Sequence, residues 1–208
     1  TIVLTNATTV DFTTGTLARV ETLTGSTGND TVTMLASHIA GMFTTVNLQG
    51  GTDILNVRSS GVEDVSAATL ATVTNVETGN LIGSTGDDDL TITGAQLDAI
   101  IVGAGTINFN TGTDVLNITS TSADLNTLGV TNASIQGLEA ISAATAAAGV
   151  TITLSGQTEA FTITGSGSGD IITGGTGADI IDAGGGNDTI NLANGAFAAG
   201  ESLTGNAG

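Results

Sequence analysis

The stretch from Gly165 to Asn191 reads GSGSGDIIT, GGTGADIID and AGGGNDTIN, three nonapeptides in a row. Asp170, Asp179 and Asp188 fall nine residues apart in it, and an isoleucine follows each aspartate by two residues. Glycine-rich turns that alternate with short apolar strands at a fixed period predict stacked coils. If two nonapeptides make one coil, every second turn shares one side of it. Asp170 and Asp188 should then lie together, and Asp179 should face the opposite side.

A coarser repeat covers the first two thirds of the chain. The turn GSTGND, which ends at Asp30, recurs as GSTGDD, which ends at Asp88. Two further turns end in Gly-Thr-Asp, at Asp53 and Asp114, with a similar separation. We therefore interpret residues 1–139 as a solenoid-like region of two units of about 60 residues, each several coils long. Residues 140–208 are predicted to be a β-roll of nonapeptides, continuous with the first region and part of a longer chain.

The local sequence favours short strands. Segments such as LTIT at 90–93 alternate β-branched residues with a period of two, and Gly, Asn or Asp bound them. Residues 34–43 and 94–100 are predicted to be short helices, and residues 123–129 a further helical turn. The alanine-rich segment 140–149 suits either a helix or a crossover. The predicted fold class is all-β, a parallel β-helix or β-roll solenoid with short helical segments in the connecting parts.

The charge of the chain limits its partners. Twenty Asp and Glu residues face only Arg19 and Arg58, so the formal net charge is −18. Such an acidic chain should repel nucleic acid and anionic membranes, and no apolar run approaches the length of a membrane span. The chain has no Cys, so disulfides cannot staple it, and a bound metal is the obvious replacement.

Side chains that commonly perform catalysis are scarce. His38 is the only histidine, and it lies in a predicted helix, where a packed histidine is more common than a ligand. Zinc sites with Cys and His ligands and lysine-containing phosphate loops are excluded by the composition. The absence of Trp and Tyr disfavours a sugar-binding cleft. We expect that the chain is not an enzyme.

The nonapeptides match the pattern G-G-x-G-x-D-x-U-x, in which U is a large apolar residue. In this the chain resembles the repeat regions of secreted bacterial RTX-type proteins (hemolysin-type calcium-binding repeats), which include surface-layer proteins, large adhesins and modules attached to exoenzymes. The resemblance is specific over residues 165–191 and looser over the longer units. It implies calcium as the cofactor, type I secretion, and folding outside the cell.

The turn residues suit calcium chemically. Calcium takes six to eight oxygen ligands, and glycine turns offer carbonyl oxygens while each aspartate adds a carboxylate. One turn supplies about half of these ligands, so the stacked turn must supply the rest. The candidate metal ligands are Asp170, Asp179, Asp188, Gly175, Gly177, Gly184 and Gly186, together with Asp30, Gly28, Asp88 and Gly86 in the earlier turns.

Several positions leave alternatives open. Asp53 and Asp114 follow only Gly-Thr, and for them an Asx-type turn, in which the aspartate caps its own backbone, is preferred to the alternative of a calcium ligand. Ser166 and Ser168 replace glycines of the pattern, and a positive φ there would strain the first nonapeptide. Asp179 needs a partner, which the segments LSGQTEAF (154–161) or GESLTGNAG (200–208) could supply.

The expected function is that of an extracellular, calcium-stabilised structural module of a bacterial surface layer, filament or matrix. The alternative is a ligand-binding or spacer module of an RTX adhesin or secreted enzyme. Expected partners are calcium ions and copies of the chain itself or other cell-surface components, with no nucleic acid and no membrane insertion.

Overall fold

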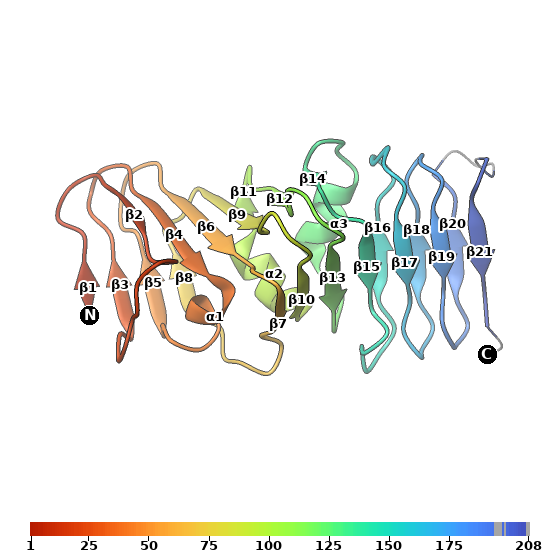
Figure 1. Cartoon of the computed structure of the whole chain (residues 1–208), viewed down its shortest axis with the longest axis horizontal. Helices are drawn as coiled ribbons and strands as arrows, with labels where there is room; N and C mark the ends of the chain where they lie inside the picture. The colour runs from red at the N-terminus through yellow and green to blue at the C-terminus, as the bar shows by residue number, and fades with distance from the viewer. Residues whose placement is uncertain (194–196, 198, 207–208) are drawn as a thin grey trace.

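The computed structural model describes residues 1–193, 197 and 199–206, and their strands build one elongated parallel β-solenoid of about nine turns. The coils stack side by side along the long axis, with the two termini at opposite ends (Figure 1). The predicted fold class is therefore confirmed. The described residues form four sheets, which we call A to D.

Sheets A and B belong to the first two thirds of the chain. Sheet A contains β1 (Ile2–Val3), β3 (Thr22–Thr24), β5 (Thr45–Asn47) and β8 (Thr72–Thr74). Sheet B contains β2 (Thr9–Asp11), β4 (Thr31–Leu35), β6 (Ile54–Arg58), β9 (Thr78–Ile82), β12 (Ile107–Asn108) and β14 (Ile135–Gln136), and β11 (Val102–Gly103) pairs antiparallel with β9.

Sheets C and D take over toward the C-terminus. Sheet C contains β7 (Val62–Asp64), β10 (Asp89–Ile92), β13 (Val115–Ile118), β15 (Ala140–Ser142), β17 (Thr162–Thr164), β19 (Ile180–Asp182) and β21 (Ser202–Thr204). Sheet D contains β16 (Thr151–Thr153), β18 (Ile171–Thr173) and β20 (Thr189–Asn191). Sheet C runs unbroken across residues 139–140, where the sequence predicts the change from long units to nonapeptides.

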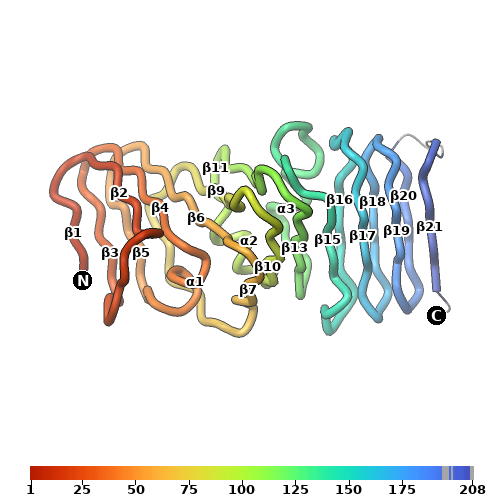
Figure 2. The backbone as a smooth tube through the Cα atoms, in the orientation of Figure 1, coloured from red at the N-terminus to blue at the C-terminus, as the bar shows by residue number. Residues whose placement is uncertain are grey.

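The length of a coil changes along the axis. Thr33 and Asn56, which pair in register between β4 and β6, are 23 residues apart. Asp88 and Asp114, which immediately precede β10 and β13, are 26 residues apart. Phe161 and Asp179, which precede β17 and β19, are only 18 residues apart. The last spacing confirms two nonapeptides per coil, and the narrow, even coils from β15 onward are plain in Figure 2.

The coarser repeat explains why the sheets change. The turn at 25–30 joins β3 of sheet A to β4 of sheet B, whereas the matching turn at 83–88 joins β9 of sheet B to β10 of sheet C. The turn at 165–170 then joins β17 of sheet C to β18 of sheet D. From Asp30 the chain makes two full coils to reach Glu77. It then passes through β9 and the turn at 83–88 before it reaches Asp88. Each unit therefore starts one sheet further on.

Three short helices occupy connections among the described residues: α1 (Ala36–Ile39), α2 (Gly94–Ile100) and α3 (Ala123–Gly129). The bounds predicted for α2 and α3 are confirmed. The helix predicted at 34–43 is much shorter, because Met34 and Leu35 still pair with β6. Residues 140–149 are not helical, since Ala140–Ser142 extends sheet C as β15. The longest of these helices has seven residues, so none of the described helices could cross a membrane.

Rows of aliphatic side chains fill the interior. In sheet C the inward row runs through Leu90, Leu116, Ile141, Ile163 and Ile181, all fully buried or nearly so. The strands are short and most of them bury only one or two such residues, so a Val, Ile and Leu core suits the stacked layers. The neighbouring Ile180 points outward and is 52% exposed, as its sequence position predicts.

Candidate functional site

Acidic side chains form columns along the solenoid axis. Each column takes the position just before a strand, in successive coils. The columns are Asp30, Asp53 and Glu77 beside sheet B; Asp88, Asp114, Glu139 and later Asp179 beside sheet C; and Asp170 and Asp188 beside sheet D. The site residues predicted from the nonapeptides and from the GSTGND-type turns therefore share one structural role, although they lie beside three different sheets.

Within a column, each carboxylate accepts a hydrogen bond from the coil before it. Asp188 Oδ1 accepts the backbone N–H of Asp170 at 2.9 Å, so the two turns predicted to form the first site do stack. Asp170 in turn accepts from the N–H of Val150 at 2.6 Å. The backbone carbonyl of Asp170 accepts the N–H of Thr189 in the next coil. The backbone N–H of Asp170 has no carbonyl acceptor in that coil and donates to the Asp188 carboxylate instead. The acid supplies that missing acceptor, because a buried N–H cannot be left unpaired cheaply.

In the G-x-x-G-x-D turns the second carboxylate oxygen is also occupied. Asp170 Oδ2 accepts the N–H of Ser166 at 2.6 Å, four residues earlier, and Asp179 Oδ2 accepts the N–H of Gly175 at 2.8 Å. Asp30 and Asp88 do the same with Ser26 and Ser84 in their turns. All four carboxylates are almost completely buried. Calcium at these turns would have to be held mainly by carbonyl oxygens or replace N–H donors, and Asp188, which is only half-buried, is the most accessible of the predicted carboxylates.

The predicted glycine ligands lie where neighbouring turns touch. A Cβ on Gly184 or Gly186 would collide with Ser166 or Ser168 of the turn below, and both glycines have positive φ, +80° and +116°. Close stacking of two turns therefore requires glycine at these positions. It also places the carbonyl of Ser166 against the turn above it, where that oxygen accepts the N–H of Gly185 at 3.0 Å. Carbonyl oxygens of this kind are ligands that calcium accepts.

The turn that ends at Asp179 lies on the opposite side of the coil and meets both predicted partners. A Cβ on Gly175 would lie 2.7 Å from the carbonyl oxygen of Gln157, and one on Gly177 would collide with the carbonyl of Glu159, so residues 154–161 stack on it. On the other side, Ser202 donates its N–H to the Asp179 carbonyl at 2.9 Å. Burial, with a smaller contribution from the charge of Glu201, raises the pKa of Asp179.

The glycines of the earlier turns differ in their surroundings. A Cβ on Gly28 would lie 2.9 Å from the Cβ of Ala7 in the first coil, whereas at Gly86 only the Ser84 hydroxyl lies near, at 3.9 Å. Each glycine donates its N–H to the serine hydroxyl two residues before it, at 3.1 Å. Asp30 and Asp88 lie in different columns, and the structure does not bring them together.

The expected strain in the first nonapeptide is absent. Neither Ser166 nor Ser168 is among the described non-glycine residues with positive φ. Instead the Ser166 hydroxyl lies 2.9 Å from Asp170 Oδ1 and also donates to the carbonyl of Ser168. Serine at this position adds a hydrogen bond to the turn and needs no unusual backbone.

The interpretation of Asp53 and Asp114 as caps of their own turns is wrong. Asp53 Oδ1 accepts the N–H of Asp30 at 2.7 Å, and Asp114 Oδ1 accepts the N–H of Asp88 at 2.7 Å, so each caps the coil before it. Both residues are 0% exposed, and the Oδ2 atom of each is buried without a hydrogen-bond partner. Such an oxygen is what a bound cation would satisfy, and it is the clearest fit to calcium in these columns.

Burial raises the pKa of both carboxyls, and neighbouring acids add to the effect. For Asp53 these are Glu77 and Asp30, and for Asp114 they are Glu139, Asp88 and Asp87.

Sequence reasoning missed the pairing of Asp30 with Asp53 and of Asp88 with Asp114. The members of the first pair are 23 residues apart and those of the second 26, so no fixed period aligns them. The matching acids that open the next coil, Glu77 and Glu139, were the available signal. Their Oε2 atoms accept the N–H of Asp53 and Asp114 at 2.7 and 2.8 Å.

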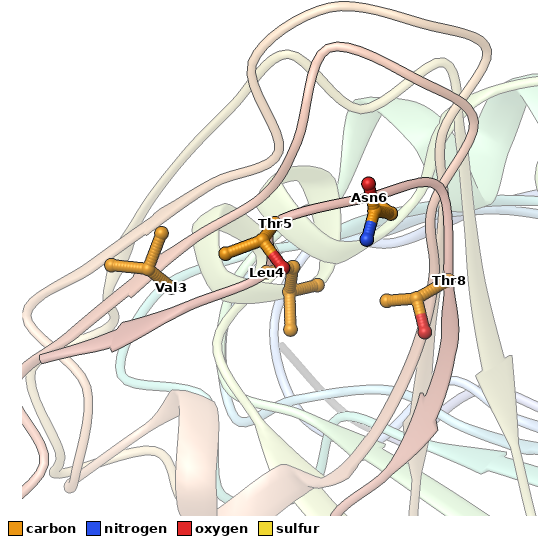
Figure 3. Close-up of a pocket in the computed structure, with 5 residues that line it drawn as sticks. All are labelled: Val3, Leu4, Thr5, Asn6 and Thr8. Atoms are coloured by element: carbon orange, nitrogen blue, oxygen red, sulfur yellow. The ribbon is translucent and has the colours of Figure 1, made fainter.

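Other parts of the described chain offer less chemistry. No group of three or more His, Cys, Asp or Glu side chains in the described ranges converges closely enough to hold a metal by side chains alone. His38 is 8% exposed and accepts the N–H of Leu35 at Nδ1. A hollow of about 250 Å³ near the N-terminus is lined by Val3, Leu4, Thr5, Asn6 and Thr8, none of them ionisable (Figure 3).

A scan against protein-family models, a search of curated proteins and a search of solved structures each returned no match to this chain. The fold and the acid columns therefore carry the functional argument.

Proposed function

We propose that this chain is an extracellular, calcium-stabilised structural module of the RTX type, which serves in a bacterial surface layer, filament or matrix. The observation that carries the proposal is the set of acid columns. Buried carboxylates repeat along the axis beside three sheets, in a chain whose formal net charge is −18. Backbone N–H groups satisfy most of these oxygens but do not neutralise their charge.

Electrostatics gives the ion a role in folding. Like charges held one coil apart repel each other, and burial weakens the screening by water. Calcium, when bound, would supply positive charge and bridge oxygens of successive coils. Because the binding groups come together only in the coiled form, the free energy of binding adds to the free energy of folding. A chain of this kind would fold where calcium is plentiful, which supports the proposal of secretion.

The proposal assigns the chain no catalytic role. The single histidine is packed inside, and two hollows among the described residues are lined by apolar residues, threonines, a glycine and an asparagine. A rod of stacked coils suits a load-carrying or spacing element, and its proposed partners are calcium and further copies of the chain.

Circular dichroism and electron microscopy with and without calcium test the proposal. We expect the β-type signal to disappear when a chelator is added and to return with CaCl2. Purified material should form lattices or fibres only with calcium. A chain that folds with calcium yet stays monomeric would favour the spacer module of an adhesin or secreted enzyme. A β-type circular dichroism signal that changes with neither chelator nor calcium would refute calcium stabilisation.

A further inference from the structure

We infer that Asp53 and Asp114 each bind one divalent cation, together with Glu77 and Glu139 of the following coil. The inference deepens the proposed function and rests on its calcium dependence. It places the ions beside the long coils of the N-terminal region, at turns that lack the nonapeptide pattern.

The first argument is the unmet carboxylate oxygen. Asp53 Oδ2 and Asp114 Oδ2 are buried and accept no hydrogen bond, while the residues themselves are 0% exposed. A buried charge without a partner is strongly unfavourable, so something must compensate it. The chain has only two basic residues, and the groups whose charges act on these two carboxyls are all acidic.

The local backbone explains why these two oxygens stay unmet. In the turns that end at Asp30, Asp88 and Asp170, the N–H four residues before the aspartate reaches its Oδ2. Before Asp53 that N–H belongs to Gln49, whose φ of +70° turns it to the side chain of Asn47 at 2.9 Å. The matching N–H before Asp114 belongs to Asn110, with φ +64°, and is likewise taken by an asparagine, Asn108. The N–H that would have donated a hydrogen bond to the oxygen therefore has another acceptor in both places.

The arrangement occurs twice, with partners at corresponding positions. Thr52, next to Asp53, donates its N–H to Asn29 of the preceding turn, and Thr113, next to Asp114, donates to Asp87. The two places lie beside different sheets, so neither is a consequence of the other's packing. A repeated unmet oxygen points to a repeated ligand rather than to a local imperfection.

The glutamates supply a second carboxylate and a route for the ion. Glu77 Oε2 lies 2.7 Å from the Asp53 nitrogen, and Glu77 is exposed as a residue, so it forms the outer wall of the site. Glu139 has the same place over Asp114. Two carboxylates are fewer than most side-chain metal sites use, so carbonyl oxygens of the turns must complete the shell. Calcium accepts such mixed oxygen ligands readily.

Calorimetric titration of the whole 208-residue chain with CaCl2 tests the inference. Asp53→Asn and Asp114→Asn should each lower the number of bound ions by one, and the double variant should lower it by two. The rise in melting temperature on adding calcium should shrink in parallel. Asparagine keeps an acceptor for the N–H of the preceding coil, so the fold should persist. Asp11→Asn and Asp64→Asn, at exposed carboxylates capped by Thr13 and Ser66, should change neither number.

The outcomes separate the two proposals. If the unaltered chain binds no calcium, the proposed calcium function and this inference both fail. If it binds calcium and the double variant binds just as many ions, this inference alone is overturned. If the asparagine variants have the same melting temperature in chelator as the parent and bind the same number of ions, a proton rather than a cation neutralises the Oδ2 atom. That result would also overturn the inference.

A second pair of variants guards against misfolding. Glu77→Gln and Glu139→Gln alter exposed residues and retain the acceptor for the aspartate N–H. Each should weaken calcium binding at one site by at least about tenfold while leaving the melting temperature in chelator unchanged. Unchanged affinity in both variants would overturn the role of the glutamates and with it the inferred sites.

Discussion

The N-terminal coils and the C-terminal roll both place an acidic residue just before a strand, but their coils differ in length. Asp30 and Asp53 are 23 residues apart and Asp88 and Asp114 are 26 apart, whereas Phe161 and Asp179 are separated by 18. The long coils contain all three described helices and the large buried side chain of Phe109. In the part of the short coils that the structure describes, there are only strands, turns and loops. Less apolar area is therefore buried per coil, and more of the stability must come from the stacked turns.

The acids that match the repeat best are not the ones whose oxygens lack hydrogen bonds. The nonapeptide acids Asp170 and Asp179 have both oxygens hydrogen-bonded, although they match the calcium pattern best. The buried carboxylate oxygens without a hydrogen bond belong to Asp53 and Asp114, whose turns match it poorly. In a stacked solenoid the partners of an acid come from the neighbouring coil, so a motif read within one turn misses half of its environment.

The largest expected effect is on the short coils. Gly184→Ala would place a Cβ against the carbonyl oxygen of Ser166 and force a left-handed φ on alanine. We expect a loss of at least about 2 kcal/mol in the free energy of unfolding, concentrated in residues 162–191. Gly167→Ala is the matched control, because nothing lies within 4 Å of its Cβ position and its φ is not positive. Chemical denaturation with hydrogen exchange would measure both.

The same variant tests whether the two regions unfold separately. If they do, amide protection should fall in the short coils and persist around β4, β6 and β9. Equal loss of protection along the whole rod would show that sheet C couples the regions into one cooperative unit. An unfolding free energy of Gly184→Ala equal to that of the control would contradict the close stacking of these turns.

A smaller loss of stability should be common to both regions, because both contain acid columns. Asp30→Ala leaves the N–H groups of Thr8 and Ser26 without their acceptor, and Asp170→Ala does the same to Val150 and Ser166. Measured in chelator, each should cost about 1–2 kcal/mol, since two hydrogen bonds are lost, which is less than the loss expected for Gly184→Ala. The exposed carboxylate variant Asp11→Ala should change little by comparison. A large cost in one region only would show that the columns are not equivalent.

Much of the fold follows from local sequence. The stacking of the short coils needs only the spacing of the three nonapeptides, and the buried places of Val32 and Leu90 follow from their position two residues after an aspartate. Helix α2 has its own signal, because Thr93 and Gln96 form a capping box at its start.

Other features depend on neighbouring coils and are hidden from a single turn. Coils of varying length erase the period that would align Asp30 with Asp53, and the coarser repeat moves each unit to a new sheet. The unmet oxygen of Asp53 is associated with the left-handed φ of Gln49. Glutamine rarely adopts this φ, so the residue type does not predict it. Nothing in the sequence states that Glu77 will cap an N–H in the coil before it. These are properties of the stack.

The smallest expected effect concerns pH and the long coils alone. His38 is packed in α1, and burial lowers its pKa below the ordinary 6.5. The unfolded chain therefore takes up a proton before the folded chain does. The stability that His38 contributes is complete above pH 6.5 and is lost as the pH falls toward the lowered pKa.

Melting temperatures in chelator between pH 8 and pH 5.5 should show this loss in the parent chain and not in His38→Gln. Acids with raised pKa, such as Asp53, change stability in the opposite direction, so only the difference between parent and variant isolates the histidine. If the regions unfold separately, exchange protection in residues 162–191 should not follow this difference. Parallel curves for parent and variant would show that His38 is not held neutral by its packing.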